Sequence, residues 1–162
     1  MYKYSCFCQL YLYICIMIDE QIIRIRAFNR FYTSIIGLLD KQYLDSEFSL
    51  TEVRIMFELH HHPGGMTASD LIDLLKLDKG YLSRLIQNLE KKKLLLKKQS
   101  ERDGRVFQLH LSPKGDNVFL GLNNASQAQV KDMLSNFTEA DIVALTGHMD
   151  AIRNIFEKSS HK

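Results

Sequence analysis

The sequence predicts a mainly α-helical protein with a small β-wing of two or three strands. Its 162 residues include only two prolines and eight glycines, so long stretches can be helical without a break. The hydrophobic period changes from 3.6 residues to 2 near Leu94, where a short β-ribbon is expected. With 46% hydrophobic and 25% charged residues, the composition indicates one ordinary folded domain with helical extensions.

The N-terminus is strongly apolar and contains every cysteine of the chain. From Tyr4 to Ile18 there is no charged residue, but this segment is shorter than the roughly 20 residues that cross a bilayer. No small-residue cleavage site follows it. We expect residues 1–16 to be an extension or an upstream mis-start, and a cytoplasmic protein to begin at Met17. A thiol-sensing or dimer-interface arm is the alternative. The cysteines are Cys6, Cys8 and Cys15.

A long first helix is predicted from Ile18 to about Leu44, because apolar residues recur at helical spacing and no proline interrupts them. Further helix starts are marked by a hydroxyl residue followed three positions later by an acid. These capping pairs are Ser49 with Glu52, Thr67 with Asp70, and Thr138 with Asp141, and Ser112-Pro113 is a fourth start signal. Helices are therefore expected at about 50–61, 68–75, 113–134 and 139–157, and a further helix is expected to begin at Asp78.

The second expected helix stops at Pro63-Gly64-Gly65, and two helices joined by a tight turn follow. In the first of these, Leu71, Leu74 and Leu75 are expected to point inward. In the second, the inward residues recur at i, i+3, i+4 and i+7. They are Leu82, Leu85, Ile86 and Leu89. The opposite face carries small or hydrogen-bonding side chains, which suits the major groove of DNA.

Two strands are predicted next, Leu94–Gln99 and Arg105–Leu111, with Asp103-Gly104 as the hairpin turn. In the second strand we expect Phe107, Leu109 and Leu111 inward and Gln108 and His110 outward. From Lys76 to Arg105 the chain holds ten basic and four acidic residues, a local net charge of +6, although the whole chain carries only +2. The combination of two helices and a basic ribbon predicts a winged helix-turn-helix.

Such a module would bind double-stranded DNA. Lysines neutralise phosphates without reading sequence, whereas Ser83, Arg84 and Gln87 have the donors and acceptors that base edges require. Arg84 is the leading specificity residue, and Arg105 is expected to enter the minor groove with Asp103 orienting its guanidinium. The predicted DNA-binding residues are Thr67, Ser69, Lys79, Gly80, Tyr81, Ser83, Arg84, Gln87, Lys91, Arg102, Asp103 and Arg105.

The stretch 49–115 resembles the winged-helix transcriptional regulators of the MarR type. Their wing pattern is Asp-x-Arg, five residues, Leu-Ser/Thr, two residues, Gly. Here it is formed by Asp103, Arg105, Leu111, Ser112 and Gly115. The likeness covers about Met17 to Phe156. Three further segments resemble the subgroup that is often fused to a GNAT acetyltransferase. They are Arg26–Thr33, Phe48–Glu52 and Gly80–Arg84.

The resemblance implies a homodimer in which the first and last helices intertwine and the two recognition helices meet a pseudo-palindromic operator. It divides the chain into an N-terminal dimerisation helix at 17–48, a winged helix-turn-helix domain at 49–112 and C-terminal dimerisation helices at 113–162. It further implies a repressor that a small aromatic or anionic effector releases from DNA. A regulatory module associated with an acetyltransferase, or a thiol-based redox sensor, is the alternative.

Two positions depart from simple expectations. Many relatives have glycine where this chain has Lys76-Leu77, and a lysine with positive φ there would cost about 1 kcal/mol.

His60-His61-His62 resembles a metal motif, but consecutive helical residues point about 100° apart and cannot converge on one ion. We expect no metal, no cofactor, no membrane partner and, in the absence of a catalytic motif, no enzyme.

Overall fold

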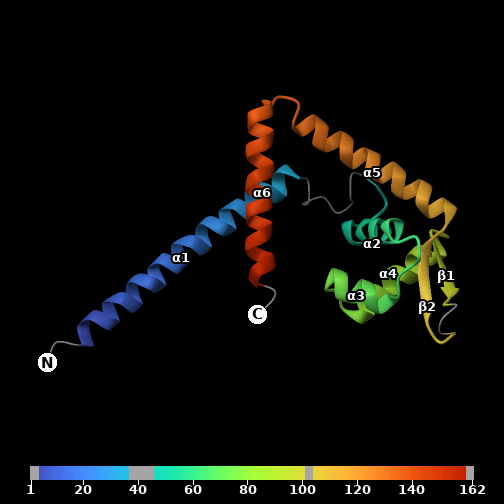
Figure 1. Ribbon diagram of the computed structural model, residues 1–162, viewed down its shortest axis with the longest axis horizontal. Helices are drawn as coiled ribbons and strands as arrows, with labels where there is room; N and C mark the ends of the chain where they lie inside the picture. Colours follow the sequence, from blue (N-terminus) through green and yellow to red (C-terminus); the bar gives the residue numbers. More distant parts are fainter. Residues whose placement is uncertain (1–3, 37–45, 101–103, 160–162) are drawn as a thin grey trace. The chain divides into compact units, whose positions relative to one another are not determined.

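The computed structural model describes residues 4–36, 46–100 and 104–159, with side chains for 17–36, 46–100 and 104–158. The chain divides into two compact units, residues 1–53 and 54–162, and the boundary falls inside one helix. Six helices and two strands are described (Figure 1). They are α1 (Tyr4–Ile35), α2 (Leu50–His61), α3 (Ala68–Leu75), α4 (Lys79–Lys91), β1 (Leu95–Gln99), β2 (Phe107–Leu111), α5 (Pro113–Met133) and α6 (Glu139–Ser159).

The first helix begins earlier than expected. α1 runs unbroken from Tyr4, so the predicted start near Ile18 is wrong. The reason is that no proline or glycine lies between Tyr4 and Ile35, and no Ser, Thr, Asp or Asn that could cap a new helix lies between Cys6 and Ile18. Its expected C-terminal part, residues 37–44, lies outside the described residues. None of the described helices is both long and apolar enough to cross a bilayer.

The capping predictions are confirmed. At Thr67 the hydroxyl accepts a hydrogen bond from the Asp70 amide, and the Asp70 carboxylate accepts one from the Thr67 amide. The same reciprocal pair joins Ser49 to Glu52 in the first unit and Thr138 to Asp141 in the second. Since the cap satisfies backbone groups that the helix itself leaves open, short sequence signals located these helix starts well.

The core of the second unit joins α2, α3, α4 and the ribbon. Seven apolar side chains, one of them on a strand, are less than 2% exposed. They are covered within this unit and need no other molecule to bury them. They are Ile55, Met56, Leu71, Leu82, Leu89, Leu94 and, from β2, Leu109. In Figure 1, α3, α4, β1 and β2 lie together as one green-to-yellow group. Leu74 was expected in this core, but it is 48% exposed on α3.

The ribbon is a two-stranded antiparallel sheet in which Leu95 pairs with Leu111 and Gln99 with Phe107. Met66 adds a single bridge to Leu109, which is the third-strand contact of the wing. Leu109 is buried as predicted, but Phe107 is 56% exposed, so its predicted inward position is wrong. The ribbon has passed the edge of the core by that point, and alternation alone does not show where the core ends.

The turn between α3 and α4 contains the strained lysine. Lys76 has φ 53° and ψ 42°, which is the left-handed conformation that glycine adopts more readily. Its amide donates to the Ile72 carbonyl and closes the helix. Lys76 therefore adopts the positive φ that costs a lysine about 1 kcal/mol relative to glycine.

Candidate nucleic-acid interface

Helix α4 presents two contrasting faces. Leu82, Ile86 and Leu89 are at most 5% exposed and hold the helix on the core. Asp78 caps its N-terminus by accepting a hydrogen bond from the Tyr81 amide at 3.0 Å. The other face is solvent-exposed and carries every α4 residue that the sequence predicted to meet DNA. They are Lys79, Gly80, Tyr81, Ser83, Arg84, Gln87 and Lys91.

The N-terminus of α3 offers less to a phosphate than its position suggests. Thr67 is half-buried and Ser69 is exposed, as an interface requires. However, the Thr67 hydroxyl already accepts the Asp70 amide, and the Asp70 carboxylate stands at the same helix end. A phosphate that approaches there meets a negative charge, which offsets part of the attraction of the helix dipole. Contact of Thr67 and Ser69 with DNA stays a prediction.

The wing is attached to α4 by an ion pair. Lys97 Nζ on β1 lies 2.9 Å from Glu90 Oε2 near the C-terminal end of α4. Both groups are partly exposed, so the pair orients the ribbon more than it stabilises the fold. Lys97 is one of the lysines of the basic stretch that could neutralise a phosphate, and Glu90 offsets part of its charge. Arg105 is exposed at the end of the ribbon, whereas the predicted Arg102 and Asp103 lie outside the described residues.

A dense hydrogen-bond seam joins the end of α4 to the start of α5. The Ser112 amide donates to the Leu94 carbonyl at 2.9 Å, and its hydroxyl donates to the Lys93 carbonyl at 2.7 Å and accepts the Gly115 amide at 2.9 Å. A Cβ on Gly115 would lie 2.1 Å from the Leu94 carbonyl oxygen. The glycine of the wing pattern is therefore required by a close backbone approach.

The three consecutive histidines point to three different acceptors. His60 Nδ1 lies 3.0 Å from Asp116 Oδ1 on α5, and the corresponding atoms of His61 and His62 lie 2.8 Å and 2.7 Å from the carbonyls of residues 57 and 58. The His60 ring also packs on Phe119, with centroids 4.7 Å apart. No sequence pattern identifies Asp116 as the partner of His60, since the two are 56 positions apart.

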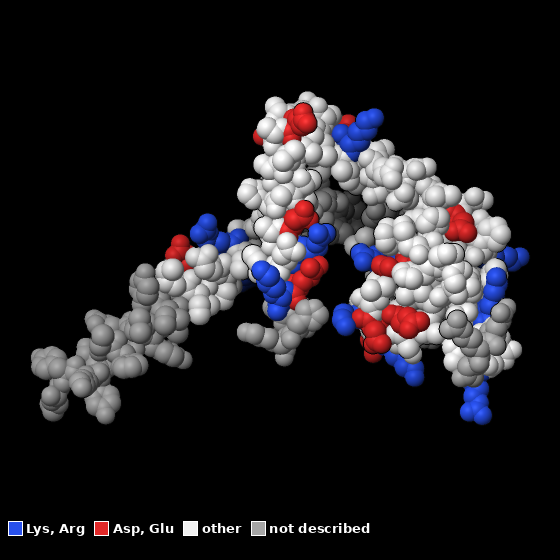
Figure 2. Space-filling view, in the orientation of Figure 1, with Lys and Arg blue, Asp and Glu red and all other residues white. Residues whose placement is uncertain are grey.

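Charge is distributed unevenly over the second unit. Figure 2 shows lysine and arginine side chains projecting at the margin of the domain that holds α3, α4 and the ribbon, whereas acidic side chains lie on the face turned to the viewer. A polyanion is therefore attracted to the margin rather than to that face.

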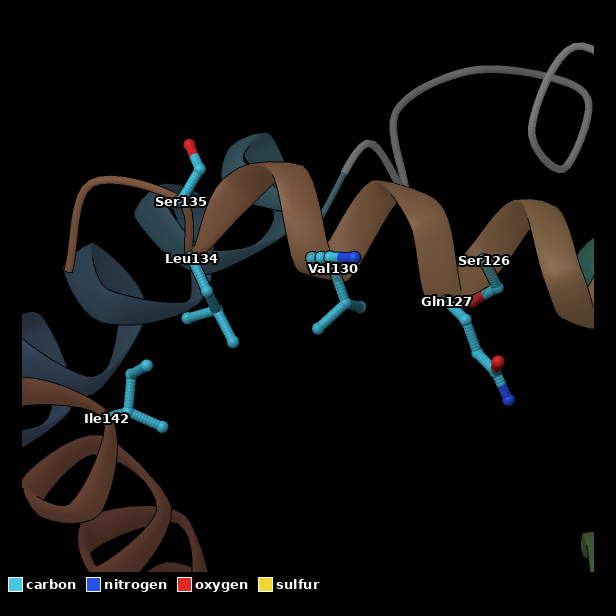
Figure 3. A pocket seen from close by; sticks show the side chains of 7 residues that line it. Ser126, Gln127, Val130, Leu134, Ser135 and Ile142 are labelled. Carbon is cyan, nitrogen blue, oxygen red and sulfur yellow. The ribbon is translucent and has the colours of Figure 1, made fainter. Parts of the chain in front are cut away.

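An open hollow of about 600 Å³ lies between the C-terminal half of α5 and the start of α6. Figure 3 shows Val130 and Leu134 of α5 projecting on the same side as Ile142 of α6. Val130 is 47% exposed, so apolar surface remains uncovered here. The polar lining residues are Ser126, Gln127, Lys131 and Ser135.

Known proteins with a similar sequence agree with this architecture. A sequence model described as "MarR family" matches residues 46–106, which run from before α2 through β1 and end just before β2. The HTH-type transcriptional regulator MhqR of Bacillus subtilis is 26% identical over 118 residues, which are 73% of this chain and 81% of the relative.

Two solved structures share the fold. The MarR family transcription regulator SP03579 superimposes with a TM-score of 0.73 at 17% identity, over 92% of this chain and 98% of that one. Streptococcus pneumoniae FabT in complex with DNA gives a TM-score of 0.71 at 21% identity, over 86% of this chain and 99% of that one.

Proposed function

Residues 46–106 match the MarR family, and from this premise we propose that the chain is a dimeric, sequence-specific transcriptional regulator that represses until a small effector releases it from DNA. The exposed polar face of α4 carries the proposal. Three residues of its apolar face are buried inside the unit, so the helix can turn its outer polar face toward a duplex.

Three groups of residues take different roles in this proposal. Arg84, Ser83 and Gln87 read base edges in the major groove, where a bidentate arginine contact discriminates by about 1–3 kcal/mol. Tyr81 and Gly80 let the helix approach closely, and the lysines at 79 and 91 contact phosphates. Arg105 reaches the minor groove with Asp103 orienting its guanidinium, and Arg102 contacts the DNA beside it.

Dimerisation is supported by apolar surface at both ends of the chain. In α1, eight large apolar side chains are 41–65% exposed, and α6 carries five between 39% and 67%. Isolated soluble helices do not keep so much apolar surface in water, and a symmetric second copy would cover it. The α1 residues are Met17, Ile18, Ile22, Ile23, Ile25, Phe28, Phe31 and Ile35, and those of α6 are Val143, Met149, Ile152, Ile155 and Phe156.

Effector release is supported by the cluster on α2 and α5. His60, Phe57 and Phe119 bring an imidazole and two phenyl rings together at centroid distances of 4.7 to 6.1 Å beside Asp116. The exposed edges of Phe57 and His60 can stack on an aromatic molecule, and an imidazole N–H can donate to its carboxylate. A ligand there would press on the first turns of α5, which the Ser112 seam joins to α4.

The decisive experiment is an in vitro selection of duplexes from a random library with the full-length protein. We expect an enriched pseudo-palindrome whose half-sites lie one or two helical turns apart. Arg84→Ala should relax the preference at one position of each half-site, whereas Lys91→Ala should weaken all sequences alike and lower the salt dependence. A library that yields no enriched site would contradict the proposal.

A further inference from the structure

The exposed Phe107 on the wing lacks a role in the function proposed so far. It is 56% exposed, whereas Leu109, two residues further along β2, is 2% exposed. Both point to the same side of the ribbon, because side chains alternate along a strand. The ring therefore sits where this face of the ribbon leaves the core.

The face that carries Phe107 is turned toward α4. Cross-strand partners share a face, so Phe107 and Gln99 lie together, one step beyond Lys97 and Leu109. Lys97 is on this face, and its Nζ reaches Glu90 on α4. A duplex that received the outer side of α4 would therefore run past the same face of the wing.

The surroundings of the ring favour an anionic partner that also has apolar surface. Arg105 comes two residues earlier in the chain, and Lys97 lies one step closer to the core on the same face. A bare anion would pair with the cations but would not cover the apolar surface of the phenyl ring. Deoxyribose rings, by contrast, present C–H groups between successive phosphates, so the ring can contact sugar while Lys97 lies near phosphate and Arg105 reaches into the minor groove.

We infer that Phe107 packs on the sugar edge of the groove beside the one that α4 enters, and so adds binding free energy that does not depend on sequence or on salt. This inference rests on the proposed function, because it needs a bound duplex. It makes Phe107 a contact residue that differs in kind from the lysines and arginines around it. Ion release makes their contribution fall with salt, whereas burial of an apolar ring involves no counterion.

The ribbon supplies a matched control. Leu96 is 43% exposed, but it pairs with His110 on the opposite face, which is turned away from Lys97 and α4. Phe107→Ser and Leu96→Ser thus remove comparable apolar surface from the two faces. Since both side chains are exposed, we expect both variants to melt close to the wild-type temperature.

The test uses the full-length protein and a labelled duplex of the selected sequence. Phe107→Ser should raise the Kd about tenfold, the loss expected when roughly half of a phenylalanine's apolar burial disappears, with an unchanged slope of log Kd against log salt. Phe107→Tyr should keep the affinity, and Leu96→Ser should leave the Kd unchanged. Arg105→Ser should lower the slope by about one.

Hydroxyl-radical footprinting at saturating protein reads the sugar contact directly. Phe107→Ser should lose protection at sugars flanking the α4 site, whereas Leu96→Ser should keep it. Full sugar protection in Phe107→Ser, or an equal loss in both variants, would overturn the inference and leave the regulator function standing. A wild-type protein that protects no duplex would refute the function and the inference together.

Discussion

Helices α4 and α6 differ in what completes them. Both carry apolar residues at helical spacing, but α4 buries Leu82, Ile86 and Leu89 against its own chain, whereas on α6 Ile155 remains 67% exposed. Helix α4 therefore belongs to a module whose core is complete within one chain. Helix α6 leaves large apolar side chains exposed, and in the proposed dimer another copy would cover them. The difference teaches that DNA recognition and assembly make different demands on one sequence, so they should fail separately when mutated.

The largest expected effect is on assembly. Ile155→Glu should raise the dimer dissociation constant by about 10³-fold, because symmetry removes two apolar contacts and places two carboxylates in the interface. Sedimentation equilibrium would measure it. Leu74→Glu is the matched control, since it changes an apolar residue of 48% exposure on α3 and should leave the dimer intact. An unaffected dimer in Ile155→Glu would remove the contrast between the two helices.

The next largest effect is on the stability of the module that contains α4 and the Ser112 seam. Gly115→Ala should lower the free energy of unfolding by about 3 kcal/mol, because the new Cβ would meet the Leu94 carbonyl oxygen, which cannot move without breaking the seam. Gly121→Ala on the same helix has no atom of the described chain within 4 Å of its new Cβ and should stabilise by about 0.5–1 kcal/mol. Urea denaturation of both variants tests this, and similar midpoints would contradict it.

A smaller effect is expected at the turn before α4. Lys76→Gly should stabilise the protein by about 0.5–1 kcal/mol, since glycine removes the strain of the left-handed conformation. Lys92→Gly is the control, because φ there is −74° and glycine should destabilise by a similar amount. Thermal unfolding of the two variants should therefore shift in opposite directions, and shifts of the same sign would refute the assignment.

The smallest effect concerns the cap of α6. Hydrogen bonds from the Thr138 hydroxyl and then from the Thr138 amide hold the pKa of Asp141 below its usual value. A depressed pKa in the folded state means that the cap stabilises fully above about pH 4 and loses this contribution as pH falls further. NMR titration should show the Asp141 pKa rising toward its usual value in Thr138→Ala. An unchanged pKa would show that the hydroxyl is not the cause.

Local signals predicted the helix starts best. The capping pairs at Ser49, Thr67 and Thr138 each need residues only three positions apart, and all three formed. Prediction failed where the outcome depends on distant packing. Phe107 and Leu74 follow the correct periodicity, yet the core stops short of both. The start of α1 failed for a different reason, since no residue there can end a helix.

The sequence by itself determined the order of the elements, the caps, the basic stretch and the polar face of α4, because each depends on neighbours along the chain. Only the tertiary structure decided that His60 meets Asp116, that Lys97 is paired with Glu90, and that Phe107 lies beyond the core. These facts depend on where separate elements pack against one another. The periodicity of a sequence does not show how far one element lies from another.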